Sequence, residues 1–305
     1  MAEDRPTQET RAGFVTLAGA PNAGKSTLLN QLVGAKVSIV SPKVQTTRAR
    51  VIGIAIEGNA QIAFVDTPGI FMPKRRLEKA MVEAAWGGVS DGDFTVLLID
   101  AQRGVSENVQ RILDGLAEQK RPIWVVLNKI DLVKKENLLA LAAQLGEMAQ
   151  VEQIFMLSAL KGDGVSDLLE ALVAKMPVGP WLYPEDQISE MPNRLLAAEI
   201  TREKLFMRLH QELPYALTVE TEAWEEKKDG SVKISQVIYV TREGHKAIVL
   251  GKGGKNARIV GQMAREELSE LLERPVHLFT FVKVREKWLD DPARYREMGL
   301  DFPKG

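Results

Sequence analysis

The sequence contains no cysteine and only three histidines, and these shortages exclude several kinds of metal and redox chemistry. Without cysteine, the chain can form neither a disulfide nor the thiolate ligands of a structural zinc site. The histidines, His210, His245 and His277, are too scattered along the sequence to suggest a metal site. The sequence therefore gives no support for zinc or thiol chemistry.

Long hydrophobic runs and an excess of charge of one sign are also missing. No apolar stretch approaches the roughly 18 residues that a membrane-spanning helix needs. The polar N-terminus lacks the apolar core of a secretion signal, so we expect residues 1–11 to be flexible and the protein to be cytoplasmic. The formal net charge is −1, from 40 Lys and Arg against 41 Asp and Glu. Any site for a polyanion must therefore be local.

The chain is long enough for two domains, and residues 12–176 form the first. Alternation of strand-like and helical patterns predicts an α/β fold with a mostly parallel sheet that helices cover on both faces. The short connection at 57–60 predicts a hairpin that makes one strand antiparallel. Strands are expected at 14–18, 51–56, 61–65, 94–99, 122–127 and 153–157, and helices at 24–33, 77–86, 106–118, 136–148 and 164–175.

The stretch from Gly19 to Ser26, GAPNAGKS, fits the P-loop pattern between a predicted strand and a predicted helix. Gly19 and Gly24 allow a tight turn whose backbone N–H groups can face a phosphate. Lys25 supplies a positive charge for the β- and γ-phosphates, and the Ser26 hydroxyl is a ligand for Mg²⁺. An ordinary glycine-rich turn with a solvated lysine is the alternative, and the flanking strand and helix argue against it.

Two further motifs lie where they could sense a γ-phosphate. The sequence DTPG follows the third predicted strand, and its Asp66 is placed to act on the Mg²⁺ side of the site. Gly69 can bring its N–H against the γ-phosphate because no side chain blocks the approach. The polar segment 36–50 contains QTTR, in which Thr46 and Thr47 are both candidate Mg²⁺ ligands. We name Ser26, Thr47 and Asp66 as the predicted metal ligands.

The motif NKID, residues 128–131, predicts guanine as the base. The Asp131 carboxylate can accept hydrogen bonds from N1–H and the 2-amino group of guanine, and adenine offers neither. Asn128 would donate to the O6/N7 edge, Lys129 would cover the ring, and the backbone of Ser158-Ala159 would close the pocket. The predicted nucleotide-binding residues are Gly19, Asn22, Ala23, Gly24, Lys25, Ser26, Thr27, Asp66, Gly69, Asn128, Lys129, Asp131, Ser158 and Ala159.

A linker with four prolines, residues 177–192, separates this domain from a second one at 193–305. The second domain has the predicted order αββααβ, which indicates a small α+β fold. Between its middle helices lies Gly251-Lys252-Gly253-Gly254, in the place where a KH domain clamps about four nucleotides of single-stranded RNA. Residues 242–265 hold six basic residues and one acidic residue, so positive charge gathers there. The predicted RNA-binding residues are Gly251, Lys252, Gly253, Gly254, Lys255 and Arg258.

With GAPNAGKS, QTTR, DTPG, NKID and SAL in this order, and IVLGKGGKNARIVG beyond them, the chain resembles the Era family of ribosome-assembly GTPases. The resemblance implies a P-loop GTPase domain and a type II KH domain, with GTP, GDP and Mg²⁺ as ligands. It implies binding to the 3′ end of 16S ribosomal RNA, not DNA, and a role in maturing the 30S subunit. It also implies a monomer and peripheral association with the inner membrane.

The position after DTPG holds Ile70, where Ras-like enzymes carry a glutamine that orients the attacking water. The resemblance implies a GTPase with a hydrophobic residue at this position, in which Asn22 recruits K⁺ as a substitute for an arginine finger. We therefore expect slow intrinsic hydrolysis that rises with RNA or a ribosomal partner. The predicted catalytic residues are Asn22, Lys25, Thr47 and Gly69.

Two alternatives stay open. A P-loop kinase or ATPase would prefer adenine, and NKID argues against it. An RNA-binding module with a passively bound nucleotide remains possible from the sequence, because Ile70 cannot orient water.

Overall fold

The computed structural model describes residues 9–120, 122–148 and 150–303, and the chain divides into two compact units. Unit 1 holds the residues up to Ser38 together with Thr47–Pro73 and Met81–Glu190. Unit 2 holds Ile39–Thr46, Lys74–Ala80 and the chain from Met191 onward. Of the N-terminus predicted to be flexible, residues 1–8 lie outside the described residues.

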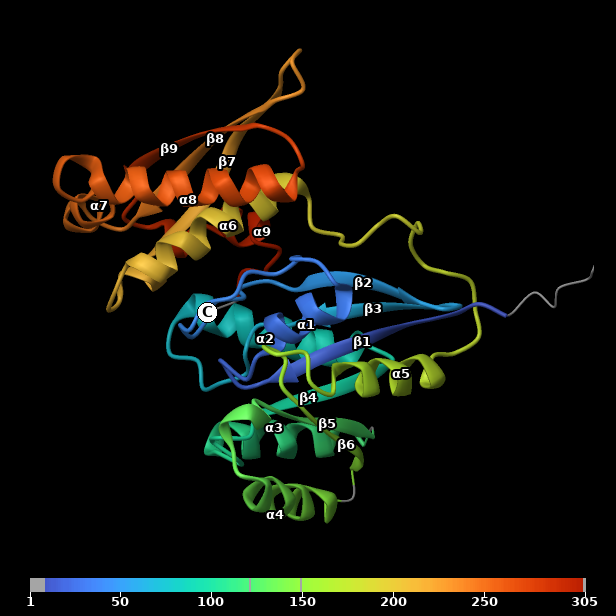
Figure 1. Ribbon diagram of the computed structural model, residues 1–305. Coiled ribbons are helices and arrows are strands. Elements are labelled where there is room, and N and C mark those ends of the chain that lie inside the picture. Colours follow the sequence, from blue (N-terminus) through green and yellow to red (C-terminus); the bar gives the residue numbers. More distant parts are fainter. Residues whose placement is uncertain (1–8, 121, 149, 304–305) are drawn as a thin grey trace, which may run out of the picture. The chain divides into compact units, whose positions relative to one another are not determined.

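Unit 1 is built on a six-stranded sheet in the order β2-β3-β1-β4-β5-β6 (Figure 1). Only β2 runs antiparallel to its neighbour, which confirms the predicted hairpin and the mostly parallel sheet. The carboxyl ends of the parallel strands meet at one edge, where ligands bind in such sheets. The strands are β1 (Arg11–Gly19), β2 (Val51–Glu57), β3 (Ala60–Asp66), β4 (Phe94–Asp100), β5 (Ile123–Asn128) and β6 (Val151–Leu157).

Five helices cover the sheet of unit 1. Helices α1 (Lys25–Val33) and α5 (Val165–Lys175) pack against each other and against strands of the sheet. Helices α2 (Arg76–Asp91), α3 (Glu107–Glu118) and α4 (Lys135–Gly146) share a hydrophobic cluster with alternate residues of β4 and β5. Because both faces are covered, strands such as β5 are buried throughout, as their continuous apolar sequence predicts.

The segment predicted as a linker is held along unit 1. The N–H of Ala12 in β1 donates to the carbonyl of Pro177 at 3.1 Å, and the N–H of Ile54 in β2 donates to Ile188 at 2.9 Å. The buried side chain of Gln61 bonds to the backbone of Tyr183, with its amide nitrogen 2.9 Å from the carbonyl oxygen. This segment therefore covers the edge of the sheet and satisfies backbone groups that an edge strand leaves open.

Unit 2 is a three-stranded sheet with its three longer helices on one face, and its order confirms the predicted αββααβ pattern. In the order β7-β8-β9, β7 is antiparallel and β9 parallel to the central strand. None of the helices formed by the described residues is long and apolar enough to cross a membrane. The elements are α6 (Asn193–Arg208), β7 (Leu217–Glu226), β8 (Val232–Val240), α7 (Glu243–Leu250), α8 (Lys255–Leu271), β9 (Val276–Val284) and α9 (Pro292–Glu297).

The segment Ile39–Thr46 belongs to unit 2, although the sequence places it in the first domain. Ile39 is 2% exposed and joins a hydrophobic cluster with residues of α6, β8 and α8. The N–H of Val40 donates to Glu203 of α6 at 2.7 Å, and Arg202 donates to the carbonyl of Thr46 at 2.5 Å. The boundary differs because contacts between residues far apart in the chain, which no local pattern reveals, hold the segment to α6.

The first turn of α2 belongs to unit 2 in the same way. Glu78 accepts hydrogen bonds from the backbone N–H of Lys74 at 2.6 Å and from the side chain of Gln45 at 3.1 Å. Arg76 forms an ion pair with Asp290 at 2.8 Å. Residues next to QTTR and DTPG, the two motifs predicted to sense the γ-phosphate, thus belong to unit 2 together with the C-terminal part of the chain.

Candidate functional site

The P-loop turns from the end of β1 into α1, and Lys25 begins that helix. Lys25 is 6% exposed, and its Nζ donates to the carbonyls of Gly19 and Ala20 at 3.2 and 3.1 Å. Burial lowers the pKa of Lys25 to about 8, although the nearby Asp66 carboxylate opposes this shift. An anion beside the amine would favour the protonated form, so the site is suited to a phosphate.

Gly24 and Asn128 show why the P-loop and NKID fit together. Gly24 has φ +99°, and a Cβ at this position would lie 2.2 Å from Asn128 Nδ2. The same Nδ2 donates to the carbonyl of Ala23 at 2.8 Å, while Oδ1 accepts the backbone N–H groups of Lys129 and Ala159 at 2.8 and 2.9 Å. Asn128 thus joins the P-loop, NKID and the Ser158-Ala159 turn, three segments that are distant in sequence.

Three predicted metal ligands converge at the end of β3. The Ser26 hydroxyl donates to Asp66 Oδ2 at 2.6 Å, and the Thr47 hydroxyl lies 2.8 Å from Ser26 Oγ and 3.3 Å from Asp66 Oδ2. The other oxygen, Asp66 Oδ1, is buried without a hydrogen-bond partner among the described residues. Burial raises the pKa of Asp66, so a cation there would favour its charged form. The hard oxygen donors and the unpaired carboxylate oxygen fit Mg²⁺.

The structure distinguishes the two candidate threonines. The Thr46 hydroxyl bonds to Ser41 Oγ at 2.6 Å and to the carbonyl of Lys43 at 2.8 Å, so it is occupied away from Asp66. Thr47 is the threonine placed with Ser26 and Asp66. Thr27, another predicted nucleotide-binding residue, follows Ser26 in the first turn of α1. 

Sequence reasoning missed one residue of this cluster, Ser38. Its hydroxyl donates to Asp66 Oδ2 at 3.0 Å, and its backbone N–H donates to Asn30 Oδ1 at 3.0 Å. No motif signals Ser38, because its position depends on the path of the chain between α1 and β2. Ser38 therefore adds a further hydroxyl on the same carboxylate oxygen.

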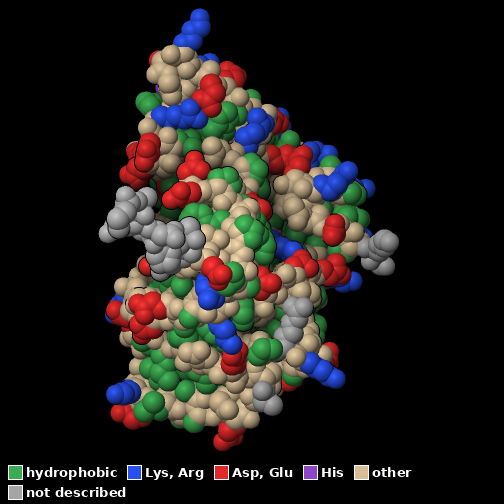
Figure 2. Space-filling view, turned by 90° about the vertical axis from the view of Figure 1, so that its right-hand side faces the viewer, with side chains coloured by type: hydrophobic (Ala, Val, Ile, Leu, Met, Phe, Trp, Pro, Cys, Tyr) green, Lys and Arg blue, Asp and Glu red, His purple; other side chains and the backbone are tan. Residues whose placement is uncertain are grey.

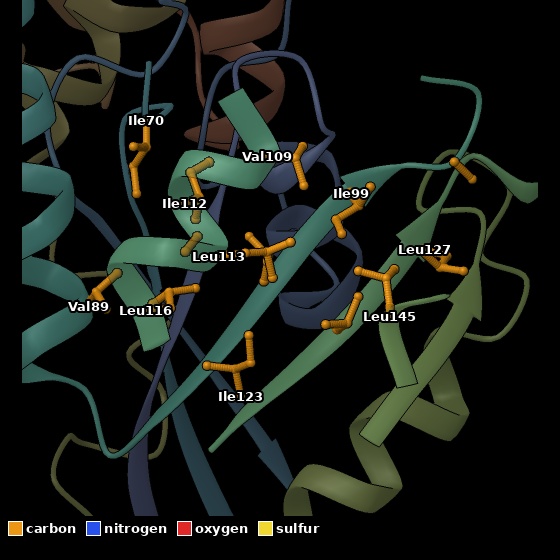
Figure 3. Close-up of a cluster of buried hydrophobic side chains, with 14 of the residues drawn as sticks. Ile70, Val89, Ile99, Val109, Ile112, Leu113, Leu116, Ile123, Leu127 and Leu145 are labelled. Atoms are coloured by element: carbon orange, nitrogen blue, oxygen red, sulfur yellow. The ribbon is translucent and has the colours of Figure 1, made fainter. Parts of the chain in front are cut away.

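DTPG lies directly against the P-loop. A Cβ at Gly69 would stand 2.9 Å from backbone and ring atoms of Pro21, so only glycine allows this approach. The N–H of Ile70 donates to the carbonyl of Gly19 at 3.1 Å. The Ile70 side chain is 5% exposed and points into the hydrophobic cluster that includes Ile112 of α3 (Figure 3). It is therefore a core residue and has no means to orient water.

The head group of Lys129 is fixed on both sides. Its Nζ donates to the carbonyl of Asn22 at 2.8 Å and pairs with Asp100 Oδ2 at 2.7 Å. Asp100 ends β4 and is another residue that sequence reasoning missed. A carboxylate at the carboxyl end of the buried strand FTVLLID was the available signal, since this is the edge where ligands bind. Asp100 orients Lys129 toward the P-loop.

Asp131 lies in a short 3₁₀ helix after β5, beside the turn that follows β6. A hydrogen bond from the Ser158 side chain lowers the pKa of Asp131, with a smaller contribution from the Lys161 charge 3.8 Å away. The carboxylate is therefore held ionised, as an acceptor of two N–H groups must be. The N–H of Ala159 donates to Asn128, so NKID and the Ser158-Ala159 turn, the two motifs predicted to contact the base, form one surface.

In unit 2, the GKGG turn joins α7 to α8. Gly253 has φ +62°, and a Cβ there would meet no atom within 4 Å, so this part of the turn is open. Lys252, Lys255 and Arg258 are exposed and form no ion pair with any residue that the structure describes. Elsewhere, acidic and basic side chains are interspersed on the face shown in Figure 2. The turn thus offers unneutralised cations and an accessible backbone, which suit phosphates.

Comparison with known proteins agrees with both units. A family model described as 50S ribosome-binding GTPase matches residues 14–129, and a KH domain model matches residues 212–289. GTPase Era of Sinorhizobium medicae is 63% identical over 295 residues, covering 97% of this chain and 95% of the relative. GTPase Era of Afipia carboxidovorans is 58% identical, with complete coverage of both chains.

Two solved structures resemble the whole chain with a TM-score of 0.91 and 39% identity. Each match covers 95% of this chain and 99% of the other. One is an Aquifex aeolicus Era variant bound to GDP·AlF4⁻. The other is Era in complex with MgGDPNP and nucleotides 1506–1542 of 16S ribosomal RNA.

Lys25→Ala removes the buried amine of the P-loop. We expect GTP binding to weaken by about 2–5 kcal/mol, the usual loss when one partner of a buried charge pair is deleted. A titration with a fluorescent GTP analogue measures the change. The matched control is Lys175→Ala, which removes an exposed lysine of α5 that pairs with Glu152. GTP affinity unchanged in Lys25→Ala would refute the P-loop assignment.

Asp131→Asn exchanges the acceptor carboxylate for an amide. The amide can donate to the 2-carbonyl of xanthine, so the preference for GTP over XTP should fall by about a hundredfold or more. Competition between the two nucleotides measures this ratio, and Asp167→Asn on the exposed first turn of α5 is the control. A ratio that stays as in the unaltered chain would contradict the role of Asp131 in base selection.

Proposed function

This chain belongs to the Era family of GTPases, and on that basis we propose that it is an RNA-binding switch for the maturation of the small ribosomal subunit. As a member of this family it hydrolyses GTP, with water attacking the γ-phosphate. Unit 1 binds the nucleotide and unit 2 binds RNA through its KH domain. The nucleotide state then controls how RNA is held.

The roles of the residues in unit 1 follow from their placement. Lys25 would hold the β- and γ-phosphates, and Ser26, Thr47 and Asp66 would hold Mg²⁺, which neutralises phosphate charge when bound. The N–H of Gly69 would face the γ-phosphate. Asn128 and Asp131 would contact guanine, and the Asp100–Lys129 pair would keep the lysine stem over the ring.

The observation that carries the switch is the attachment of segment 39–46 to α6. Arg202 of α6 donates to the carbonyl of Thr46, and the next residue in the chain is Thr47, which lies at Ser26 and Asp66. Lys43 also donates to the carbonyl of Phe206 at the end of α6. A change in the position of Thr47 on loss of the γ-phosphate would therefore be transmitted to α6, the helix that packs against the KH sheet.

The proposed RNA is the 3′ region of 16S ribosomal RNA, as part of the 30S subunit. An Era structure 39% identical to this chain contains nucleotides 1506–1542 of that RNA. The exposed Lys252, Lys255 and Arg258 at the GKGG turn support single-stranded RNA as the ligand. An alternative function as a P-loop kinase or ATPase would prefer adenine, and the lowered pKa of Asp131, which keeps its carboxylate an acceptor, supports guanine instead.

We also propose that K⁺ assists hydrolysis through Asn22. Ile70 is buried in the core and cannot orient water, so hydrolysis would depend the more on stabilising the charge of the transition state, which a cation at the phosphates would supply. Asn22 has φ +64° in the P-loop, and its carbonyl accepts from Lys129. A monomeric state and peripheral membrane association follow from the family resemblance alone, and they stay predictions, as does the cytoplasmic location expected from the sequence.

Gly253→Asp places a carboxylate in the GKGG turn. Because a Cβ there meets no protein atom, the fold should tolerate the change, while repulsion should weaken binding to the 16S fragment about tenfold or more. Fluorescence anisotropy with nucleotides 1506–1542 measures RNA affinity, and GTP affinity should not change. 

The matched control is Gly230→Asp in the β7–β8 turn. Gly230 has φ +82° and the same open surroundings, so it carries an equal conformational cost in the same unit. Equal RNA affinity of Gly253→Asp and Gly230→Asp would contradict the KH site.

Asn22→Ala tests the proposed monovalent cation. We expect GTP hydrolysis in the presence of the RNA to be about tenfold faster in K⁺ than in Na⁺ at equal ionic strength, because a cation at the phosphates stabilises developing charge. Asn22→Ala should abolish this difference while GTP still binds, and Asn137→Ala on exposed α4 should preserve it. Equal rates in both salts would exclude the K⁺ role, and no turnover in either would favour a passively bound nucleotide.

A further inference from the structure

A groove in unit 2 follows the outer edge of β7 and shares no residue with the GKGG turn. Its volume is about 490 Å³, which is in the range of sites that hold a ligand. It is lined mainly by residues 218–222 of β7, by the first two turns of α6 and by α9 (Figure 1). Neither nucleotide binding nor the proposed RNA site accounts for this groove.

The backbone of β7 points into this groove at Val219. β7 ends the order β7-β8-β9, and no strand formed by the described residues pairs with its outer edge. On the other side of β8, Val240 accepts the N–H of Arg285 at 2.8 Å, so Val240 and, by alternation, Ile238 direct their backbone groups to β9. Val219 is opposite Ile238 in the antiparallel pair, and it therefore directs its own N–H and C=O away from β8.

A contact at Thr221 agrees with this direction. Thr221 is two residues from Val219, so its carbonyl points to the same side, and it accepts a hydrogen bond from the Arg194 side chain of α6 at 2.8 Å. The N–H and C=O of Val219 bond to no residue that the structure describes. The edge thus keeps a donor and an acceptor on one residue, which is the pair that an added antiparallel strand uses.

The side of the groove at α9 carries an excess of negative charge. Glu220 of β7 and Glu297 of α9 both pair with Arg294, and the distance to Glu297 is 2.8 Å. Burial and the Glu297 charge raise the pKa of Glu220 to about 7, although Arg294 opposes this shift. Glu222, by contrast, has a lysine of its own, Lys283, at 3.0 Å. Because two carboxylates share one guanidinium, a further cation in the groove would stabilise their charged forms.

These features together select one class of occupant. The excess of carboxylates repels phosphate groups, which disfavours RNA and anionic lipid. A polyamine would meet the carboxylates, but it has no acceptor for the N–H of Val219. An extended polypeptide offers an N–H and a C=O at every residue, and a lysine or arginine in it supplies the cation.

The two faces of β7 also indicate the pattern of such a segment. Val219 belongs to the hydrophobic cluster that includes Ala198 of α6, whereas Glu220 is on the opposite face of the strand. In an added strand, the residue paired with Val219 therefore points to the apolar side, and the next residue points to the side of Glu220. Apolar and basic side chains should alternate.

We propose that the groove binds an extended segment of a basic protein, which pairs with Val219 as a further strand and places a lysine or arginine at Glu220 and Glu297. This site is independent of the GKGG turn. Basic extended arms are typical of proteins that bind nucleic acid, so the partner expected here is another RNA-binding protein.

The test measures binding of a fluorescein-labelled peptide, Thr-Val-Lys-Val-Lys-Val-Thr, to the full chain by fluorescence anisotropy. The double variant Glu220→Gln/Glu297→Gln keeps the shape of both side chains and removes their charge, so it should bind the peptide about tenfold more weakly or worse. The matched control is Glu225→Gln/Glu226→Gln at the end of the same strand, outside the groove, and it should bind the peptide as the unaltered chain does.

Two further peptides test the strand itself on the unaltered chain, so this arm does not depend on how a variant folds. N-methylation of the three valines keeps every side chain and charge but removes the N–H groups that would pair with Val219. This peptide should bind about tenfold more weakly or worse. A peptide with glutamate in place of both lysines should lose binding to a similar extent, because like charges repel.

No binding of the lysine peptide, or equal affinity in the Glu220→Gln/Glu297→Gln variant, would overturn the proposal. Equal affinity for the plain and N-methylated peptides, with displacement of both by spermidine, would show a site for a simple cation and not for a strand. The double variant should bind nucleotides 1506–1542 of 16S ribosomal RNA with unchanged affinity. Weaker RNA binding by this variant alone would assign the groove to RNA instead.

Discussion

A fully buried carboxylate at the end of β3 is the constraint on which the predicted nucleotide site of unit 1 depends. Asp66 is 0% exposed, and one of its oxygens accepts from Ser26, Ser38 and Thr47 while the other has no partner among the described residues. An ionised carboxylate in such a place is costly unless positive charge compensates it. Its burial therefore favours a bound cation. The P-loop, strand β3 and the segment that precedes β2 all meet at its Oδ2 atom.

The same carboxylate gives a physical basis for the proposed coupling between RNA and nucleotide. Thr47 can reach Asp66 only when Thr46 lies close by, because consecutive Cα atoms are 3.8 Å apart. Thr46 in turn is held by the buried guanidinium of Arg202. Nucleotide binding that places Thr47 would therefore also change the free energy of the contacts between Thr46 and α6. Linkage requires the converse, so RNA that stabilises one arrangement of α6 must change nucleotide affinity by the same factor.

Local sequence patterns were sufficient for the strands, the helices and most of the residues that converge at the candidate site. Apolar runs such as FTVLLID predict buried parallel strands, and the glycines of GAPNAGKS predict the turn, because each depends on neighbouring residues only. Ser38, Asp100 and the attachment of Ile39 to unit 2 were missed. Each acts through a partner at least 28 residues away, at Asp66, Lys129 or the α6 cluster, and such pairings leave no local trace.

Unit 2 gathers unpaired positive charge at one turn. Lys252, Lys255 and Arg258 are exposed at the GKGG turn and form no ion pair with any described residue, whereas Lys283 on β9 is paired with Glu222. Cations of this kind attract the uniform phosphate backbone, and their attraction weakens as salt rises. Because phosphate contacts carry no sequence information, a preference for one RNA sequence would have to come from contacts to the bases.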